Sequence, residues 1–195
     1  MKDGHARLDA VLDFWLGPSD GAGCYPWREI WFQVVPEFDA ELRAKFLACH
    51  EDAAAGRFDH LADTPFRALA LVILLDQIPR NIFRGTPRMY ATDHKALATA
   101  QRAVAHGFDL RVHHVPRTFF YTPFEHSEDI AVQRHSLELV LRRNDSPDYE
   151  RTLYYIRRHA EIVERFGRFP HRNAILGRVS TPEEIEFLKE KDSSF

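Results

Sequence analysis

Five proline residues directly follow a serine or a threonine, and they divide the chain into segments. The pairs are Thr64-Pro65, Thr86-Pro87, Thr122-Pro123, Ser146-Pro147 and Thr181-Pro182. A serine or threonine hydroxyl caps the free N–H groups at the start of a helix. Proline is favoured in the first helical turn, where its missing N–H costs nothing. Each pair therefore predicts the start of a helix, and at the last pair Glu184 completes a capping box.

Apolar residues recur at helical spacing through most of the chain. We predict helices over residues 6–16, 37–55, 65–78, 87–107, 116–121, 124–142, 147–166 and 182–188. No segment alternates as a strand would, and no Asn-Gly or Asp-Gly hairpin turn occurs. The sequence thus predicts an all-α single domain of antiparallel helical hairpins over residues 1–195, with a motif-bearing core at about 8–190.

The helix predicted over residues 65–78 is apolar almost all round, with Leu71, Val72 and Ile73 in succession. A helix without a polar face is buried at the centre of its fold. A buried parallel strand is the alternative reading. The length of the segment and its alanine and leucine content favour the helix.

Composition excludes several classes of function. The net charge of −3 gives no strong attraction to nucleic acid. The longest apolar run, residues 68–75, is much shorter than the roughly 20 residues that span a bilayer. The first residues lack the apolar run of a signal peptide, so we expect a cytoplasmic protein without a membrane partner. The oligomeric state stays open, a homodimer included.

No cofactor or metal is expected from the sequence. Cys24 and Cys49 match no metal-site spacing and no disulfide framework. A phosphate-binding loop, a dinucleotide fingerprint and a nucleophile motif are also missing from the sequence.

The first of three polar clusters interrupts the apolar pattern at the end of the most buried predicted helix. Its members are Asp76, Gln77, Arg80, Asn81 and Arg84. An unpaired charge would be costly at Asp76, so this residue needs a partner. Arg80 is the nearest candidate, and an arginine from residues 165–178 is another. A structural ion pair is the plainer alternative to a ligand site.

The second cluster comprises Glu125, His126, Glu128 and Asp129. If a helix begins at Phe124, His126 points inward, and the acids complement the positive end of the helix dipole. His126 is then either a core histidine or a catalytic one.

The third cluster is residues 165–178, where glycine and proline shape a loop. It carries Arg165, Arg168, His171, Arg172, Asn173 and Arg178. Arginine forks bind carboxylate and phosphate through two hydrogen bonds. The alternative is that these arginines neutralise Asp76, Glu125 and Asp129 within one structural network.

The three clusters, LLDQIPRNIFRG, PFEHSED and RFGRFPHRNAILGR, stand with VLDFWLG near the start of the chain. Together they resemble the domain-of-unknown-function 924 family of bacteria and fungi, over residues 11–188. The resemblance implies an all-helical fold of the tetratricopeptide-like superfamily. It assigns no catalytic residues, because none is established for the family.

The hypothesis we favour is a pocket that binds or transforms a small anionic molecule. Arg80, Arg168 and Arg172 would hold the anion, and His126 or His171 would act as general acid or base, oriented by Glu125 or Asp129. The remaining ligand-binding candidates are Asp76, Gln77, Asn81, Arg84 and Asn173.

Three other readings remain. Glu125, His126, Asp129 and His171 could hold a metal, but arginine-rich surroundings disfavour a cation. Stacked helical hairpins could bind a peptide or a protein along a concave surface. Finally, the clusters could be purely architectural. Whether the chain is an enzyme stays open.

Overall fold

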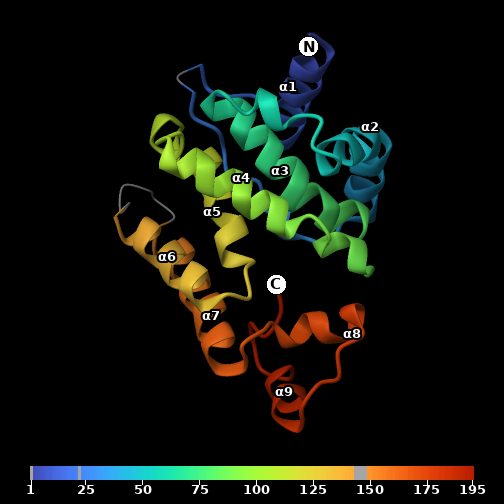
Figure 1. Cartoon of the computed structure of the whole chain (residues 1–195), viewed down its shortest axis with the longest axis vertical. Helices are drawn as coiled ribbons and strands as arrows, with labels where there is room; N and C mark the ends of the chain where they lie inside the picture. Colours follow the sequence, from blue (N-terminus) through green and yellow to red (C-terminus); the bar gives the residue numbers. More distant parts are fainter. Residues whose placement is uncertain (1, 22, 143–148) are drawn as a thin grey trace. The chain divides into compact units, whose positions relative to one another are not determined.

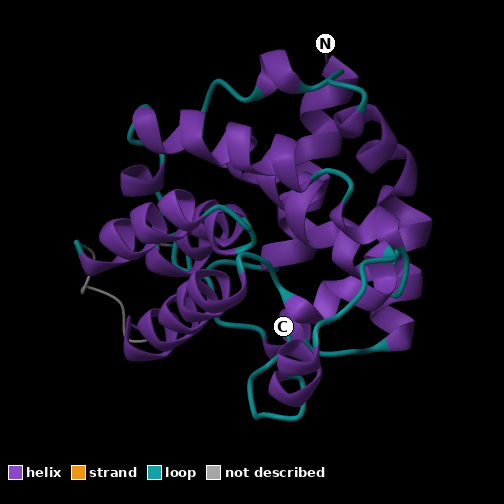
Figure 2. Cartoon of the chain, turned by 60° about the horizontal axis from the view of Figure 1, so that its bottom comes forward, coloured by secondary structure: helices purple, strands orange, loops and turns teal. Residues whose placement is uncertain are grey.

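The computed structural model describes residues 2–21, 23–142 and 149–195, and throughout these ranges the regular structure is helical. Figure 2 shows helices joined by loops, with no strand in the described part of the chain. The predicted all-α class is confirmed. The tetratricopeptide-like arrangement stays a prediction.

The chain divides into two compact units. We call Met1–Arg84 with Arg88–Pro123 the N-terminal unit, and Gly85–Pro87 with Phe124–Phe195 the C-terminal unit. Each is described by itself. The expectation of a single domain over residues 1–195 stays a prediction.

The N-terminal unit is built around one buried helix, α3. Its α-helices are α1 (Lys2–Leu16), α2 (Pro36–Ala54), α3 (Pro65–Ile82), α4 (Asp93–Ala105) and most of α5 (His114–Glu125). Its short 3-10 helices are η1 (Glu29–Phe32), η2 (Asp59–Leu61), η3 (Pro87–Tyr90) and η4 (Asp109–Arg111). Helix α3 packs against α1, α2 and α4 (Figure 1). Every side chain from Leu69 to Leu75 is fully buried, which confirms the expected central helix and excludes a strand.

Helix α3 begins where the sequence predicts and ends four residues later than predicted. The Thr64 hydroxyl accepts a hydrogen bond from the Arg67 N–H, with Pro65 in the first turn. The helix continues past Pro79 to Ile82. Because Pro79 has no N–H, it leaves the Leu75 carbonyl without its helical donor. The Thr92 hydroxyl donates to this carbonyl at 2.6 Å, and the helix continues without an unpaired group there.

The C-terminal unit contains a pair of helices and a compact loop region. Its elements are α6 (Ile130–Leu141), α7 (Tyr149–Phe166), η5 (Pro170–Arg172), α8 (Asn173–Leu176) and α9 (Pro182–Phe187). Helices α6 and α7 lie side by side (Figure 1). Ile162, Val163, Phe169 and Phe187 form a buried apolar cluster. The capping box predicted at Thr181 and Glu184 is confirmed.

A helix predicted over residues 124–142 is confirmed for residues 130–141, but its predicted start is wrong. Pro123 lies inside α5, and α6 begins at Ile130 with Asp129 as its N-cap. The missing N–H of Pro123 frees the Phe119 carbonyl, and the Thr122 hydroxyl lies 3.3 Å from that oxygen. The same hydroxyl lies 3.0 Å from Asp76 Oδ2, so Thr122 contacts the preceding turn and α3 instead of capping a new helix.

The pair Thr86-Pro87 leads into the 3-10 helix η3 and not directly into an α-helix. Helix α4 begins only at Asp93, so the helix predicted over residues 87–107 is divided. The pair Ser146-Pro147 lies outside the described residues.

Candidate functional site

The first polar cluster forms ion pairs inside the N-terminal unit. Asp76 is fully buried, and Arg80 Nη1 lies 3.2 Å from its Oδ1 atom, which confirms the predicted pairing. Arg80 also binds both carboxylate oxygens of Asp93, at 2.9 and 3.0 Å. Burial opposes the charge of Arg80, yet Asp76 and Asp93 raise its pKa above the ordinary value. Arg80 is therefore a fixed cation held by two acids.

The other members of this cluster also bind carboxylates. Gln77 Nε2 donates to Asp76 Oδ2 at 2.6 Å and to the Thr122 hydroxyl at 3.2 Å. Asn81 and Arg84 both donate to Asp39 of α2, at 2.7 to 3.1 Å. These bonds connect α3 to α2 and α5, so the cluster has a structural task.

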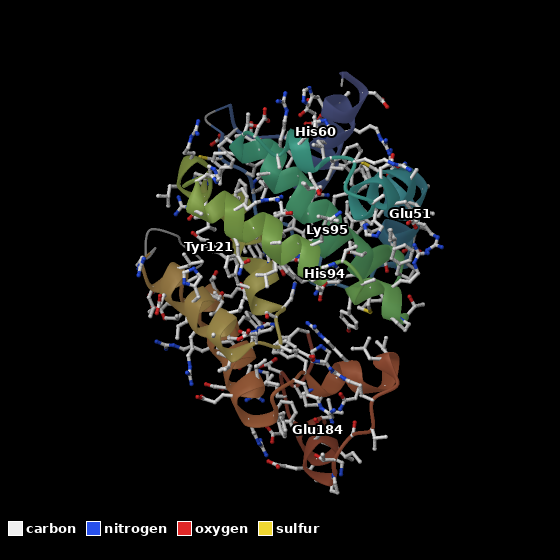
Figure 3. The ribbon with its side chains drawn as sticks, viewed as in Figure 1. Glu51, His60, His94, Lys95, Tyr121 and Glu184 are labelled. Atoms are coloured by element: carbon white, nitrogen blue, oxygen red, sulfur yellow. The ribbon has the colours of Figure 1, made fainter. Side chains whose placement is uncertain are left out.

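Arg168 and Asn173 of the third cluster hold one buried acid, Glu184. Figure 3 labels this residue, which lies on α9. Arg168 donates to its two oxygens at 2.6 and 2.8 Å, and Asn173 Nδ2 donates to Oε2 at 3.2 Å. Although burial acts in the opposite direction, the hydrogen bond from Arg168 lowers the pKa of Glu184 to about 2. Glu184 is thus ionised and stabilised within the unit.

Arg178 and the backbone of Phe169 hold Glu128 in the same way. Arg178 donates to the two oxygens of Glu128 at 2.7 and 2.9 Å, and the Phe169 N–H donates at 2.8 Å. Burial opposes the charge of Glu128, but these hydrogen bonds lower its pKa below the ordinary 4.5. Sequence reasoning assigned neither Glu128 nor Glu184 to these arginines.

A different environment surrounds Arg172. We call His126, His159, His171 and Arg172 the histidine cluster. The rings of His126 and His159 lie 6.2 Å apart, measured between centroids. Arg172 Nη2 donates to the carbonyl oxygen of His126 at 2.9 Å, and its guanidinium lies over the ring of Phe169. The structure therefore brings three predicted residues together with one that was missed.

The missed residue, His159, lies on α7 between Ile156 and Val163. It belongs to the buried stripe of this helix, at three residues from one apolar neighbour and four from the other. A histidine within an apolar helical stripe is the signal that would have found it.

Two histidines of the cluster have strongly lowered pKa values. Burial, followed by the nearby charge of His126, lowers the pKa of His159 from 6.5 to about 3. Burial and the charge of Arg172 lower the pKa of His171 to about 3 as well. Both rings are therefore neutral near pH 7.

The two rings differ in their hydrogen bonds. His159 Nδ1 donates to the Tyr155 carbonyl at 2.8 Å, which leaves the lone pair on Nε2. His171 Nδ1 is buried and has no hydrogen-bond partner among the described residues. One nitrogen of His159 can thus accept a hydrogen bond, and one buried nitrogen of His171 lacks a partner.

Residues 11–192 match the family model described as "Bacterial protein of unknown function (DUF924)". The chain belongs to this family. The solved structure of a protein of unknown function from Agrobacterium tumefaciens is similar to this DUF924 protein, with 41% sequence identity and a TM-score of 0.84. The similarity covers 96% of this chain and 99% of that one. Comparison with curated proteins gives no match.

The structure shows the surroundings of three residues that the sequence predicts as general acids, bases or orienting groups of this DUF924 protein. Asp129 is exposed, and its Oδ1 atom caps α6 by accepting from the Ala131 N–H at 2.8 Å. Glu125 is buried, and its carbonyl accepts a hydrogen bond from Gln133 at 2.6 Å. A histidine with a pKa near 3, such as His171, is a weak base at neutral pH.

Within residues 2–21, 23–142 and 149–195, no group of three or more His, Cys, Asp or Glu side chains could hold a metal ion. In the same ranges no helix is both long and apolar enough to cross a bilayer.

Proposed function

We propose that the C-terminal unit binds a small anionic molecule at the histidine cluster, with Arg172 as its anchoring cation. The observation that carries this proposal is the setting of Arg172. Its side chain is buried over an aromatic ring, and it donates to the neutral carbonyl of His126. Its charge also acts on Glu128, which binds Arg178 directly.

The electrostatics of the cluster support an anionic ligand. Arg172 contributes to the lowered pKa values of His159 and His171, so its positive charge acts on both rings. A negative group brought close to these side chains would interact with that charge where burial weakens solvent screening. The same group would make protonation of the two histidines easier.

The buried Nδ1 atom of His171 offers the ligand a second contact. A buried polar atom without a partner costs about 1–3 kcal/mol, which a hydrogen bond to the ligand would recover. Hydrogen phosphate can pair with Arg172 and serve either tautomer of His171, because it carries both an O–H donor and oxygen acceptors. Sulfate has no O–H at neutral pH and serves only the Nδ1–H tautomer.

In this proposal Arg80, Arg84 and Arg168 do not anchor the ligand. Each is engaged by a carboxylate of its own unit, so its charge is already compensated. The prediction that residues of both units serve one ligand stays a prediction.

Calorimetric titration with inorganic phosphate and with sulfate at pH 7 tests the proposal. We expect phosphate to bind more tightly, and Arg172→Ala to abolish binding of both anions. Arg157→Ala is the matched control, because Arg157 lies on the exposed face of α7. The proposal is wrong if neither anion binds at millimolar concentration, or if Arg157→Ala and Arg172→Ala have equal effects.

A further inference from the structure

The ring of Phe195 covers one face of the histidine cluster. It stacks on His159 with 3.9 Å between centroids and 24° between planes. The Phe195 ring also lies edge-on to the ring of His171, with 6.1 Å between centroids. The side chain of Phe195 is still 44% exposed, so the ring lies on the cluster without being enclosed by it.

Few bonds hold the segment that carries this ring. Ser193 donates to the Leu188 carbonyl at 3.1 Å, and Tyr154 donates to Asp192 Oδ2 at 2.8 Å. Arg158 Nε donates to the Asp192 carbonyl at 3.1 Å. Asp192 itself has a φ of +53°, a conformation that L-residues rarely adopt. Release of the segment would relieve this strain and break one exposed and two partly buried hydrogen bonds.

The face beneath Phe195 is suited to a flat ring. His159 is a neutral imidazole, and the ring of Phe169 lies edge-on to it at 5.6 Å. Aromatic pairs favour stacked and edge-on arrangements, so the two rings leave one flat face for a third ring. Arg172 lies over Phe169, with its guanidinium carbon 4.6 Å from the centroid, and it supplies a positive charge beside that face.

We propose that the ligand of the histidine cluster is an aromatic anion, whose flat ring displaces Phe195 from His159 while its negative group pairs with Arg172. This inference rests on the proposed function and names the class of molecule that the site takes. Phe195 is then an internal competitor, which covers the site until such a ligand arrives.

Competition has a measurable consequence. A ligand that needs Phe195 to leave binds only to the open fraction of molecules. Its apparent dissociation constant is therefore the intrinsic constant divided by that fraction, which is a larger value. Removing the ring of Phe195 should tighten binding by roughly three- to tenfold, the range expected for one aromatic stack of this kind. Changes that leave the ring in place should have no such effect.

Benzoate and cyclohexanecarboxylate form a matched pair of probes, because they share charge and size but only benzoate is flat. We would titrate both into the wild-type protein, Phe195→Ala and Ser194→Ala, with Ser194 as an exposed neighbour in the same segment. We expect benzoate to bind roughly tenfold more tightly than cyclohexanecarboxylate. Phe195→Ala should tighten benzoate binding, and Ser194→Ala should leave it unchanged. In NMR spectra, benzoate should shift the His159 ring signals.

Three outcomes would overturn the inference. Equal affinity for the two probes excludes a site that prefers a flat ring. Unchanged or weaker benzoate binding by Phe195→Ala excludes competition between Phe195 and the ligand. In both cases the proposed function stands if phosphate still binds in an Arg172-dependent manner. If neither benzoate nor phosphate binds to the wild-type protein or to Phe195→Ala, both proposals fail. Should Phe195→Ala not fold, Phe195→Leu keeps an apolar side chain without the flat ring, and the same expectations apply.

Discussion

The guanidinium of Arg172 lies over the ring of Phe169, 4.6 Å from its centroid. Four residues earlier, Arg168 forms a two-pronged ion pair with Glu184, which is only 2% exposed. Two arginines of one short segment therefore contact very different groups. One stabilises a buried acid, and the other adds a positive charge beside the neutral rings of His159 and His171.

Replacing these two arginines should affect stability unequally. Arg168→Ala leaves Glu184 buried without its main counterion, and we expect a loss of about 3 kcal/mol in the free energy of unfolding. Arg172→Ala removes a cation–π contact and one hydrogen bond, for a loss of about 1–2 kcal/mol. Urea unfolding measures both values. An Arg172→Ala loss as large as that of Arg168→Ala would make Arg172 a structural residue and weaken the proposed function.

The histidine cluster predicts how stability depends on pH. His159 has a folded-state pKa of about 3 against an ordinary value of 6.5, and His171 is similar. Between these values the unfolded chain binds protons that the folded protein does not, so stability falls as the pH is lowered. The contribution is complete above about pH 6.5 and is lost progressively down to about pH 3, by at most about 1.4 kcal/mol per pH unit for each histidine.

A non-titrating ring at position 159 separates this effect from that of the acids. His159→Phe keeps a flat ring and should flatten the decline in unfolding free energy between pH 7 and pH 5. The carboxylate of Glu184, with a pKa of about 2 against an ordinary 4.5, contributes stability that is lost only at lower pH. A pH profile of the variant that is as steep as that of the wild type would show that His159 is not the titrating group.

The start of α6 gives a third prediction. Asp129 caps this helix through its own carboxylate, so Asp129→Ala should cost about 1 kcal/mol in stability. Asp129→Asn keeps the oxygen acceptor and should cost little. Thermal or urea unfolding compares the two variants. If alanine and asparagine behave alike at this position, the cap adds nothing to the stability of the helix.

Helix content could be predicted from the sequence because it depends on local spacing, as α3 and α9 show. The function of a Thr-Pro pair could not. Thr64 and Thr181 cap the helices that follow, whereas Thr122 lies over the Phe119 carbonyl that Pro123 leaves free. The same dipeptide suits both tasks, and the folded surroundings decide between them.

The candidate site was harder to predict than the fold. The glycine- and arginine-rich loop was found from its composition, but the acids that bind Arg168 and Arg178 come from positions 16 residues later and 50 residues earlier. His159 was missed because its spacing is that of an ordinary core position. Sequence spacing within one segment carries no information on such long-range partners.

The proline inside α3, Pro79, gives the last prediction. The Leu75 carbonyl receives its hydrogen bond from the Thr92 hydroxyl, since Pro79 has no N–H to offer. Thr92→Val should leave this buried carbonyl unpaired and cost about 1–3 kcal/mol in unfolding free energy. Pro79→Ala restores an N–H at the helical position, so in that background Thr92→Val should cost much less. A double-mutant cycle measures the difference as a coupling energy. If the two substitutions were simply additive, the hydroxyl of Thr92 would not be replacing the missing helical donor.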